Sequence, residues 1–305
     1  MHYTLHQLRI FLKVHECQSI TKAAEELFLT QPAVSIQLKK LQDQFDIPLT
    51  EVIGRKLFIT DFGNEIAARS RRILDETDAI KYTVDRFKGL VTGRISISVV
   101  STGKYVIPFF LRDFLDEHPG VDVSIDVSNK LKVVEGLHAN ESDFSLVSVL
   151  PDSPPLNTVE LLENRLYLVK GRSLDVDITK PKDLEAVTLV FRENGSATRT
   201  AMEEYLQKHR VKVSKKLELV SNEAVKQAVT AGLGVSIVPL IGLRNAIKTG
   251  AMSIVPMRGL PMRSRWSLVY NKGKKLTPAQ AALVSHIEQN KDQIAHRYFE
   301  WALED

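Results

Sequence analysis

The spacing of apolar residues divides the chain into three zones. From residue 5 to about residue 46 the apolar positions recur at helical intervals, and Pro48 ends this zone. After the turn at Gly54, residues 56–60 have the composition of a short strand. The first zone therefore predicts a small helical domain followed by a strand.

The second zone, residues 61 to about 90, has one long helical pattern without an internal proline. Apolar residues recur there at every seventh position: Ile66, Ile73, Ile80 and Phe87. This spacing is typical of the seam between two paired helices. Because an isolated helix is marginally stable in water, we expect this one to pair with a second copy of the chain; packing on its own domain is the alternative. Gly93 is expected to end the zone.

In the third zone, segments with strand character alternate with segments of helical periodicity. Predicted strands are 95–100, 121–127, 144–149, 187–191, 217–220 and 235–238, and predicted helices are 105–117, 131–139, 197–209 and 223–231. The repeated βαβ order predicts two α/β lobes, each with a mostly parallel sheet. Two further strands, 161–169 and 266–270, are placed to cross between the lobes, and an amphipathic helix, 278–302, ends the chain.

The segment from Ser19 to Phe45 is the strongest functional motif. Ser19 or Thr21 can cap a first helix, and Thr30 can cap a second one. The amide and hydroxyl groups of the second helix suit base edges in the major groove, and cations that follow suit phosphates. The candidate DNA-binding residues are Thr30, Gln31, Pro32, Ser35, Gln37, Lys39, Lys40, Arg55 and Lys56. The alternative is an ordinary helical hairpin with solvated lysines.

Composition adds limits to this picture. The chain of 305 residues is 44% hydrophobic and 26% charged, as in ordinary globular proteins, and its net charge of +4 is too small to indicate a nucleic-acid partner alone. The single cysteine, Cys17, excludes an intrachain disulfide and is either a small core residue or a redox-sensing thiol. With no signal peptide and no long apolar run, we expect a soluble, cytoplasmic protein with no membrane partner.

Four segments resemble the N-terminal signature of LysR-type transcriptional regulators. They are Leu8-Arg9-Ile10-Phe11, Ala23-Ala24-Glu25-Glu26-Leu27, Thr30-Gln31-Pro32-Ala33-Val34-Ser35 and Thr60-Asp61-Phe62-Gly63. The resemblance implies an α/β protein with an N-terminal, all-α winged helix-turn-helix (1–60), a long linker or dimerisation helix (61–92) and a two-lobed effector domain like periplasmic binding proteins (93–305). Lobe I would comprise about 93–161 and 266–305, and lobe II about 162–265.

The implied partners are double-stranded DNA, a small anionic effector, RNA polymerase, and further copies of the chain in a homodimer or homotetramer. Two departures from the family pattern stand out. Ile36 occupies a position where the family commonly has arginine, and residues 49–52 lack the common Leu-Phe-x-Arg. Three segments, 4–9, 100–105 and 221–229, resemble the branch that regulates Calvin-cycle (RuBisCO) and carbon-uptake operons.

Two hydroxyl-rich turns are candidates for the effector site. Residues 101–104 follow a predicted strand of lobe I, and residues 194–199 follow one of lobe II. In such folds a ligand lies at the carboxyl ends of strands, near helix N-termini. The candidate effector-binding residues are Ser101, Thr102, Lys104, Ser148, Ser196, Thr198 and Arg199, with Ser148 taken from the resemblance. The alternative is that these hydroxyl groups are ordinary helix N-caps.

Two other classes of function remain to be weighed. An enzyme could use the α/β lobes, but the sequence has no dinucleotide-binding, phosphate-binding-loop or nucleophile-elbow motif and no His-Glu-x-x-His pair. A solute-binding protein would fit the lobes but not the N-terminal hairpin. We therefore predict a sequence-specific regulator without catalytic residues, metal or cofactor.

Overall fold

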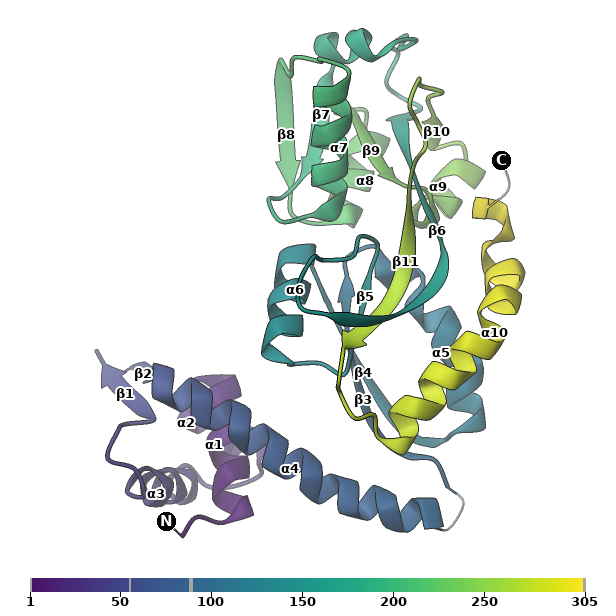
Figure 1. Ribbon diagram of the computed structural model, residues 1–305. Coiled ribbons are helices and arrows are strands. Elements are labelled where there is room, and N and C mark those ends of the chain that lie inside the picture. Colours follow the sequence, from purple (N-terminus) through teal and green to yellow (C-terminus); the bar gives the residue numbers. More distant parts are fainter. Residues whose placement is uncertain (1, 55, 88–89, 304–305) are drawn as a thin grey trace. The chain divides into compact units, whose positions relative to one another are not determined.

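The computed structural model describes residues 2–54, 56–87 and 90–303, without the side chains of residues 78, 79 and 81–87. The chain divides into two compact units, Met1–Gly89 and Leu90–Asp305. Figure 1 shows the first unit as helical and the second as a mixed α/β structure. Among the described residues, no helix has the length and apolar character needed to cross a membrane.

Three capped helices build the first unit: α1 (Leu5–Cys17), α2 (Ile20–Glu26) and α3 (Gln31–Gln42). The Ser19 side chain accepts a hydrogen bond from Lys22 N, and the Thr30 side chain accepts one from Ala33 N, so both predicted caps are confirmed. Thr4 caps α1 in the same way. Their apolar faces meet in one core that includes Phe11, Ala23, Ala24, Val34, Leu38 and Leu41.

The wing is a two-stranded hairpin. Strand β2 (Lys56–Ile59) was expected, but its antiparallel partner β1 (Thr50–Ile53) was not. β1 has a weak pattern because three of its four residues are exposed. The N-terminal domain is therefore not all-α, because it also contains the hairpin of β1 and β2.

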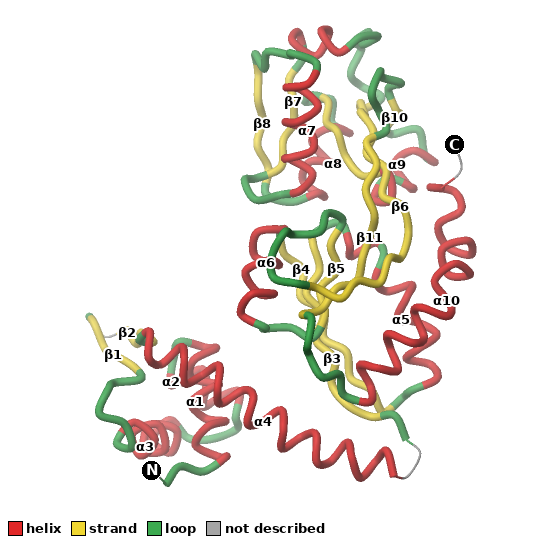
Figure 2. Tube along the Cα trace, viewed as in Figure 1, coloured by secondary structure: helices red, strands yellow, loops and turns green. Residues whose placement is uncertain are grey.

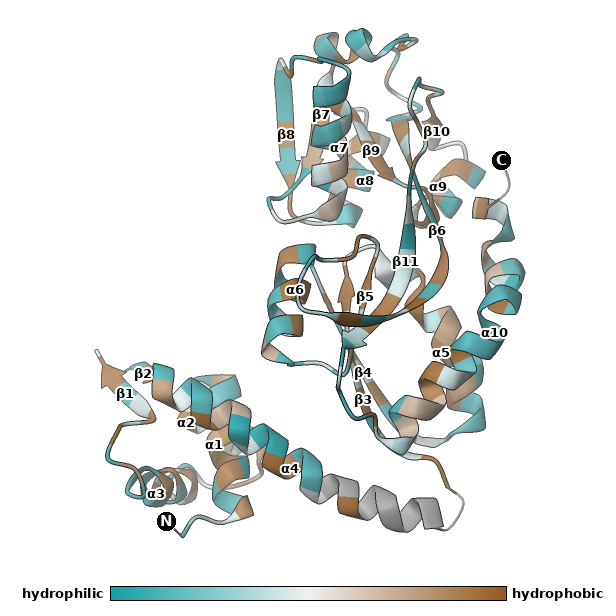
Figure 3. Ribbon diagram, in the orientation of Figure 1, coloured by the Kyte–Doolittle hydropathy of each residue, from teal (hydrophilic) through white to brown (hydrophobic). Residues whose placement is uncertain are grey.

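Helix α4 (Asp61–Phe87) confirms the predicted long helix. Its first turns pack on the N-terminal core, where Ile66 and Leu74 are partly buried. Ile73 is 40% exposed and Ile80 is 67% exposed, while the Phe87 side chain lies outside the described residues. In Figure 3 the described part of α4 is mostly hydrophilic with separate hydrophobic bands. The N-terminal part of the helix therefore packs on its own domain, the alternative interpretation of the heptad pattern. Pairing of the remaining part with a second copy stays a prediction.

The second unit contains one sheet, in the order β4-β3-β5-β11-β6-β9-β7-β8, with β10 paired to β6. Its strands are β3 (Thr92–Val100), β4 (Gly120–Ser128), β5 (Phe144–Val147), β6 (Leu156–Gly171), β7 (Thr188–Arg192), β8 (Lys215–Leu219), β9 (Val235–Pro239), β10 (Met252–Ile254) and β11 (Met262–Asn271). The expectation of two separate, mostly parallel sheets was wrong, because one mixed sheet runs through both lobes. The outer strands are parallel, but β6 and β11 run antiparallel to their neighbours.

β6 and β11 join the two lobes into this single sheet. They pair with each other from Leu156↔Asn271 to Leu166↔Met262. β11 then continues against β5 in lobe I, and β6 continues against β9 in lobe II. The two expected crossing strands are therefore confirmed, and their mutual pairing is the feature that the pattern did not reveal.

Helices cover both faces of each lobe, as Figures 1 and 2 show. They are η1 (Gly103–Tyr105), α5 (Ile107–Glu117), α6 (Lys130–Ala139), η2 (Pro181–Ala186), α7 (Ala197–Lys208), α8 (Asn222–Thr230), η3 (Leu240–Gly242), α9 (Arg244–Lys248) and α10 (Pro278–Leu303). Along β7, Leu189 and Phe191 join the core under α7, whereas Val190 joins the core under α8. This alternation is what a strand buried on both faces requires.

Some predicted boundaries were wrong by a few residues. Gly93 lies inside β3 and does not end the linker, because β3 pairs with β4 from Thr92 onward. The predicted helix 105–117 begins as the 3-10 turn η1 and becomes α5 only after Val106. β5 ends at Val147, so Ser148 lies just beyond the strand.

Two glycines in helices give a paired test of packing. A Cβ atom at Gly63, in α4, would collide with the Leu49 carbonyl oxygen, whereas one at Gly136, in α6, would meet only the flexible Glu141 side chain at 3.3 Å. We expect Gly63→Ala to lower the free energy of unfolding of the first unit by about 1–3 kcal/mol.

Gly136→Ala is the matched control. Alanine is the better helix former, so this variant is expected to hold or raise stability by up to about 1 kcal/mol. Calorimetric unfolding of the full chain measures both changes, and equal effects from the two substitutions would contradict the packing argument.

Candidate DNA-binding surface and effector site

The predicted DNA-binding residues gather on α3, its N-cap and the wing. Thr30, Gln31, Pro32, Lys39, Lys40 and Lys56 are exposed, and Ser35 is half-buried. The Thr30 hydroxyl already accepts the capping hydrogen bond. Arg55 lies outside the described residues, so the wing contributes Lys56 to the surface that can be described.

Gln37 differs from the other members of this set. Its Oε1 accepts a hydrogen bond from Gln7 Nε2 at 3.3 Å, which ties its side chain to α1. It is also only half-exposed. Gln37 therefore helps to hold α3 against α1, a contact that the spacing along α3 could not predict.

The two hydroxyl-rich turns lie at facing ends of the lobes. In lobe I, the parallel strands β3 and β5 are neighbours and pair at Val99 and Leu146. Thr102 follows the carboxyl end of β3 and Ser148 follows that of β5, so the two residues lie at the same edge of the sheet. In lobe II, the turn before α7 follows the carboxyl end of β7. The backbone N–H of Leu131, in lobe I, donates to the Gly195 carbonyl at 3.2 Å, which brings the turn of lobe II against lobe I.

Thr102 and Ser196 differ from the capping residues elsewhere in the described chain. Ser19, Thr30, Asn129 and Ser221 accept hydrogen bonds from backbone N–H groups of the helices they precede. The side chains of Thr102 and Ser196 make no such bond, although they are 7% and 4% exposed. The interpretation of these two as ordinary N-caps is therefore wrong, and the first N–H groups of η1 and α7 are left without a side-chain acceptor.

Ser148 and Thr198 are also buried, with 7% and 8% exposure. Lys104 is half-buried, and its Nζ lies 5.2 Å from the centre of the Tyr105 ring. Thus four of the predicted groups are buried hydroxyls at the ends where the lobes meet, and Lys104 is drawn toward Tyr105.

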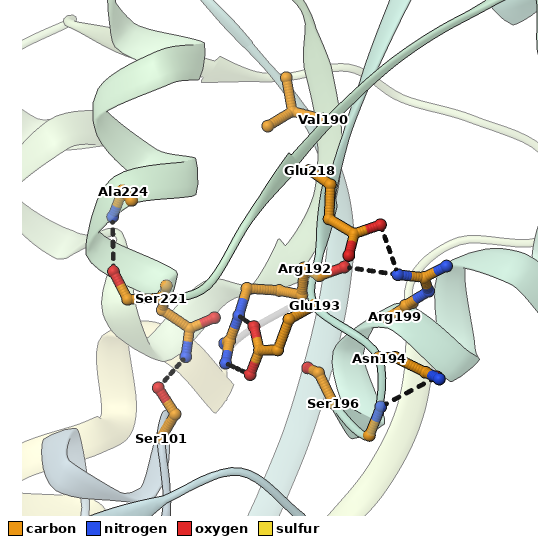
Figure 4. Close-up of polar contacts among 12 residues, drawn as sticks. Ser101, Val190, Arg192, Glu193, Asn194, Ser196, Arg199, Glu218, Ser221 and Ala224 are labelled. Atoms are coloured by element: carbon orange, nitrogen blue, oxygen red, sulfur yellow. Dashed lines mark hydrogen bonds and ion pairs between the residues drawn. The ribbon is translucent and has the colours of Figure 1, made fainter.

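Arg199, which we predicted as a charge for the effector, is already engaged by three groups of lobe II. Its guanidinium donates to Glu203 and Glu218 at 2.8 Å and to the Arg192 carbonyl at 3.2 Å. These partners raise its pKa above the usual range, the hydrogen bond to Glu203 being the largest cause. Figure 4 shows Arg199 turned toward Glu218 of β8. Because two carboxylates already balance its charge, Arg199 fastens α7 to β8.

Arg192, the last residue of β7, is the cation that sequence reasoning missed. Its side chain is 3% exposed and is held by Glu193 through two hydrogen bonds of 2.7 and 2.8 Å, which are drawn in Figure 4. A charge buried this deeply needs such a partner. The available signal was an arginine at the carboxyl end of an apolar strand, directly before the hydroxyl-rich turn.

Polar contacts also link the two lobes beside these turns. Asn222 Nδ2, at the start of α8, donates to Ser101 Oγ at 3.1 Å, and the buried Asn222 Oδ1 has no hydrogen-bond partner within the described chain. The Tyr105 hydroxyl donates to Glu223 at 3.3 Å. Burial, with added effects of the Glu223 charge and hydrogen bond, raises the pKa of Tyr105 to about 12. Ser101 is thus engaged by the opposite lobe.

Cys17 is half-buried against the core of the first unit, and its Sγ lies 3.5 Å from Glu26 Oε1. Desolvation and the Glu26 carboxylate raise the pKa of the thiol, which disfavours the reactive thiolate. Where the structure describes the chain, no group of three or more His, Cys, Asp or Glu side chains is arranged to hold a metal ion.

Comparisons with known proteins identify the class of both units. Residues 5–64 match the family described as "Bacterial regulatory helix-turn-helix protein, lysR family", and residues 88–292 match the "LysR substrate binding domain". The chain belongs to the LysR family. It is a DNA-binding transcriptional regulator with an effector-binding domain, and regulators of this family are not enzymes.

Several relatives match along most of the chain. The transcriptional activator CmpR of Synechocystis is 34% identical over 295 residues, 96% of this chain and 97% of CmpR. The RuBisCO operon transcriptional regulator of Acidithiobacillus ferrooxidans is 34% identical over 291 residues, which cover 94% of each chain.

Two solved structures add comparisons with bound molecules. The regulatory domain of Synechocystis CcmR in complex with 2-PG is 30% identical, has a TM-score of 0.62 and covers 66% of this chain and 98% of that domain. Full-length CbnR complexed with target DNA is 25% identical, has a TM-score of 0.67 and covers 94% of this chain and 99% of CbnR. Winged helix-turn-helix, linker helix and α/β effector domain accordingly occur in the predicted order.

The Arg192–Glu193 pair gives a test of buried charge. Glu193→Gln leaves the Arg192 charge in place without its counter-ion, so we expect the free energy of unfolding to fall by about 3–5 kcal/mol. Urea denaturation of the full chain measures this change.

Glu203→Gln is the matched control, because Glu203 is 51% exposed in its ion pair with Arg199. Exposed pairs contribute at most about 1 kcal/mol. If Glu203→Gln lowered the free energy of unfolding as much as Glu193→Gln, burial of the charge would not explain the effect.

Proposed function

We propose that this regulator controls genes of CO2 fixation or inorganic-carbon uptake in response to a small phosphorylated or carboxylated metabolite. The names of the relatives CmpR and the RuBisCO operon regulator support the target class. The ligand 2-PG (2-phosphoglycolate) of the CcmR regulatory domain supports the effector class. The observation that carries the proposal is the pair of buried, non-capping hydroxyls, Thr102 and Ser196, before two helix N-termini.

An anion between the lobes would complete hydrogen bonding that the chain leaves open. The free N–H groups at the start of α7, the partial positive charge of that helix end and the buried hydroxyls are all suited to phosphate or carboxylate oxygens. We propose Thr102, Ser148, Ser196 and Thr198 as its direct partners, with Ser101 and Lys104 at the edge. We add Arg192, a buried cation at the end of β7, and no longer propose Arg199, which fastens α7 to β8.

For DNA, we propose that α3 enters the major groove. Gln31 and Ser35, near its N-terminus, would meet base edges, and Thr30 and Pro32 would fix the approach of the first turn. Lys39, Lys40 and Lys56, together with Arg55, would meet phosphates. Gln37 could contact DNA only by donating through its side-chain amide hydrogens, because its oxygen already accepts a hydrogen bond from Gln7.

The linker helix α4 is proposed to pair with its copy in a homodimer. The exposed Ile73 and Ile80, seven residues apart, support this, since they have no core of their own to join. We propose that the chain functions in three parts, 1–60, 61–92 and 93–305, in the cytoplasm where its DNA is found. Assembly into a tetramer and contact with RNA polymerase are proposals that follow from the family alone.

The effector proposal is tested by calorimetric titration with 2-PG. Thr102→Val keeps the shape of the side chain and removes its hydroxyl, so we expect the affinity to fall about tenfold or more, as for a lost hydrogen bond to a charged group. Thr249→Val, at an exposed threonine after α9, is the control and should bind as the wild type does. Equal affinities of wild type and Thr102→Val would refute the site.

The DNA proposal is tested by the salt dependence of operator binding. Lys39→Gln removes one phosphate contact and should reduce the slope of log Kobs against log salt concentration by about one per bound subunit. Lys248→Gln changes the net charge equally at an exposed site in the effector domain and should leave the slope unchanged. An unchanged slope in Lys39→Gln would show that this lysine does not reach the backbone.

A further inference from the structure

Ile36 lies in the middle of the outer face of α3. It comes two residues after Val34 and two before Leu38, and two steps along an α-helix correspond to about 200° around its axis. Val34 and Leu38 are buried against the other helices of the first unit, with 0% and 6% exposure, whereas Ile36 is 53% exposed. Ile36 therefore points almost directly away from the core.

The neighbours of Ile36 on this face are Pro32, one turn before, and Lys39 and Lys40, one turn after. All three are exposed. An apolar side chain thus stands at the centre of a surface whose edge is positively charged. With α3 in the major groove, the lysines at its C-terminal end would meet phosphates, and Ile36, one turn closer to the N-terminus, would meet base edges.

The chemistry of base edges limits what Ile36 can meet there. It can form no hydrogen bond, and covering a polar base edge with it would remove water without replacement. The major groove offers one apolar group to a side chain, the C5 methyl of thymine.

We propose that Ile36 contacts a thymine methyl in each half-site and so selects an A·T pair with thymine at that position. This inference rests on the proposed placement of α3 in the major groove. It assigns a specificity-determining role to the position where the resemblance led us to expect arginine. At this position the chain would have an apolar contact with a base in place of a phosphate contact, while Lys39 and Lys40 would still contact the DNA backbone.

The test replaces thymine by deoxyuridine, which differs only by the missing methyl group. Full-length protein first selects its preferred duplex from a random pool, and each thymine of that duplex is then replaced in turn. For the wild type, we expect one replacement per half-site to weaken binding about three- to fivefold, the value of burying one methyl group. Ile36→Ala should bind the thymine and deoxyuridine duplexes equally at that position.

Ile47→Ala is the matched control, because Ile47 has the same chemistry and 54% exposure but lies beyond α3. It should retain the full response to deoxyuridine, and unchanged melting temperatures would show that both variants fold. Indifference of the wild type to every replacement would overturn the inference, as would an undiminished response in Ile36→Ala. Failure to select any sequence would instead contradict the proposed placement of α3 in the major groove.

Discussion

The pairing of β6 with β11 is the constraint on which the effector domain depends. Each strand serves both lobes, so the sheet is continuous while the chain crosses twice between them. The register shifts between Trp266 and Ser267, where β11 passes from one lobe to the other. The shared pair of strands therefore fixes the two lobes within one continuous sheet.

The turn of lobe I that we propose for effector binding, residues 101–104, is packed directly on this crossing. Gly103, which follows Thr102, has no room for a Cβ atom because Val99, Leu146 and the Trp266 ring surround it. A ligand that draws Thr102 toward lobe II would therefore act on the strand that joins the lobes. Such a ligand can shift the arrangement only as far as it binds one arrangement more tightly than the other.

The positions of individual charges in this protein matter more than its net charge. The net charge of +4 comes from nearly equal numbers of opposite charges, and several of these are paired with each other. Arg199 is neutralised by Glu203 and Glu218, and Arg192 by Glu193. In contrast, Lys39 and Lys40 make no ion pair with any other residue that the structure describes, so they remain available to an anionic partner such as DNA.

The sequence by itself determined the local elements, because caps and periodicity depend on residues one to four positions apart. Thr30 as the cap of α3, the length of α4 and the order of strands and helices all follow from such short-range relations. Only the tertiary structure decided that Arg192, and not Arg199, is the buried cation beside the hydroxyl-rich turn, and that Gln37 is bonded to α1. The direction of a side chain depends on partners distant in the sequence, such as Gln7 thirty positions before Gln37 and Glu218 nineteen after Arg199, and no local pattern records them.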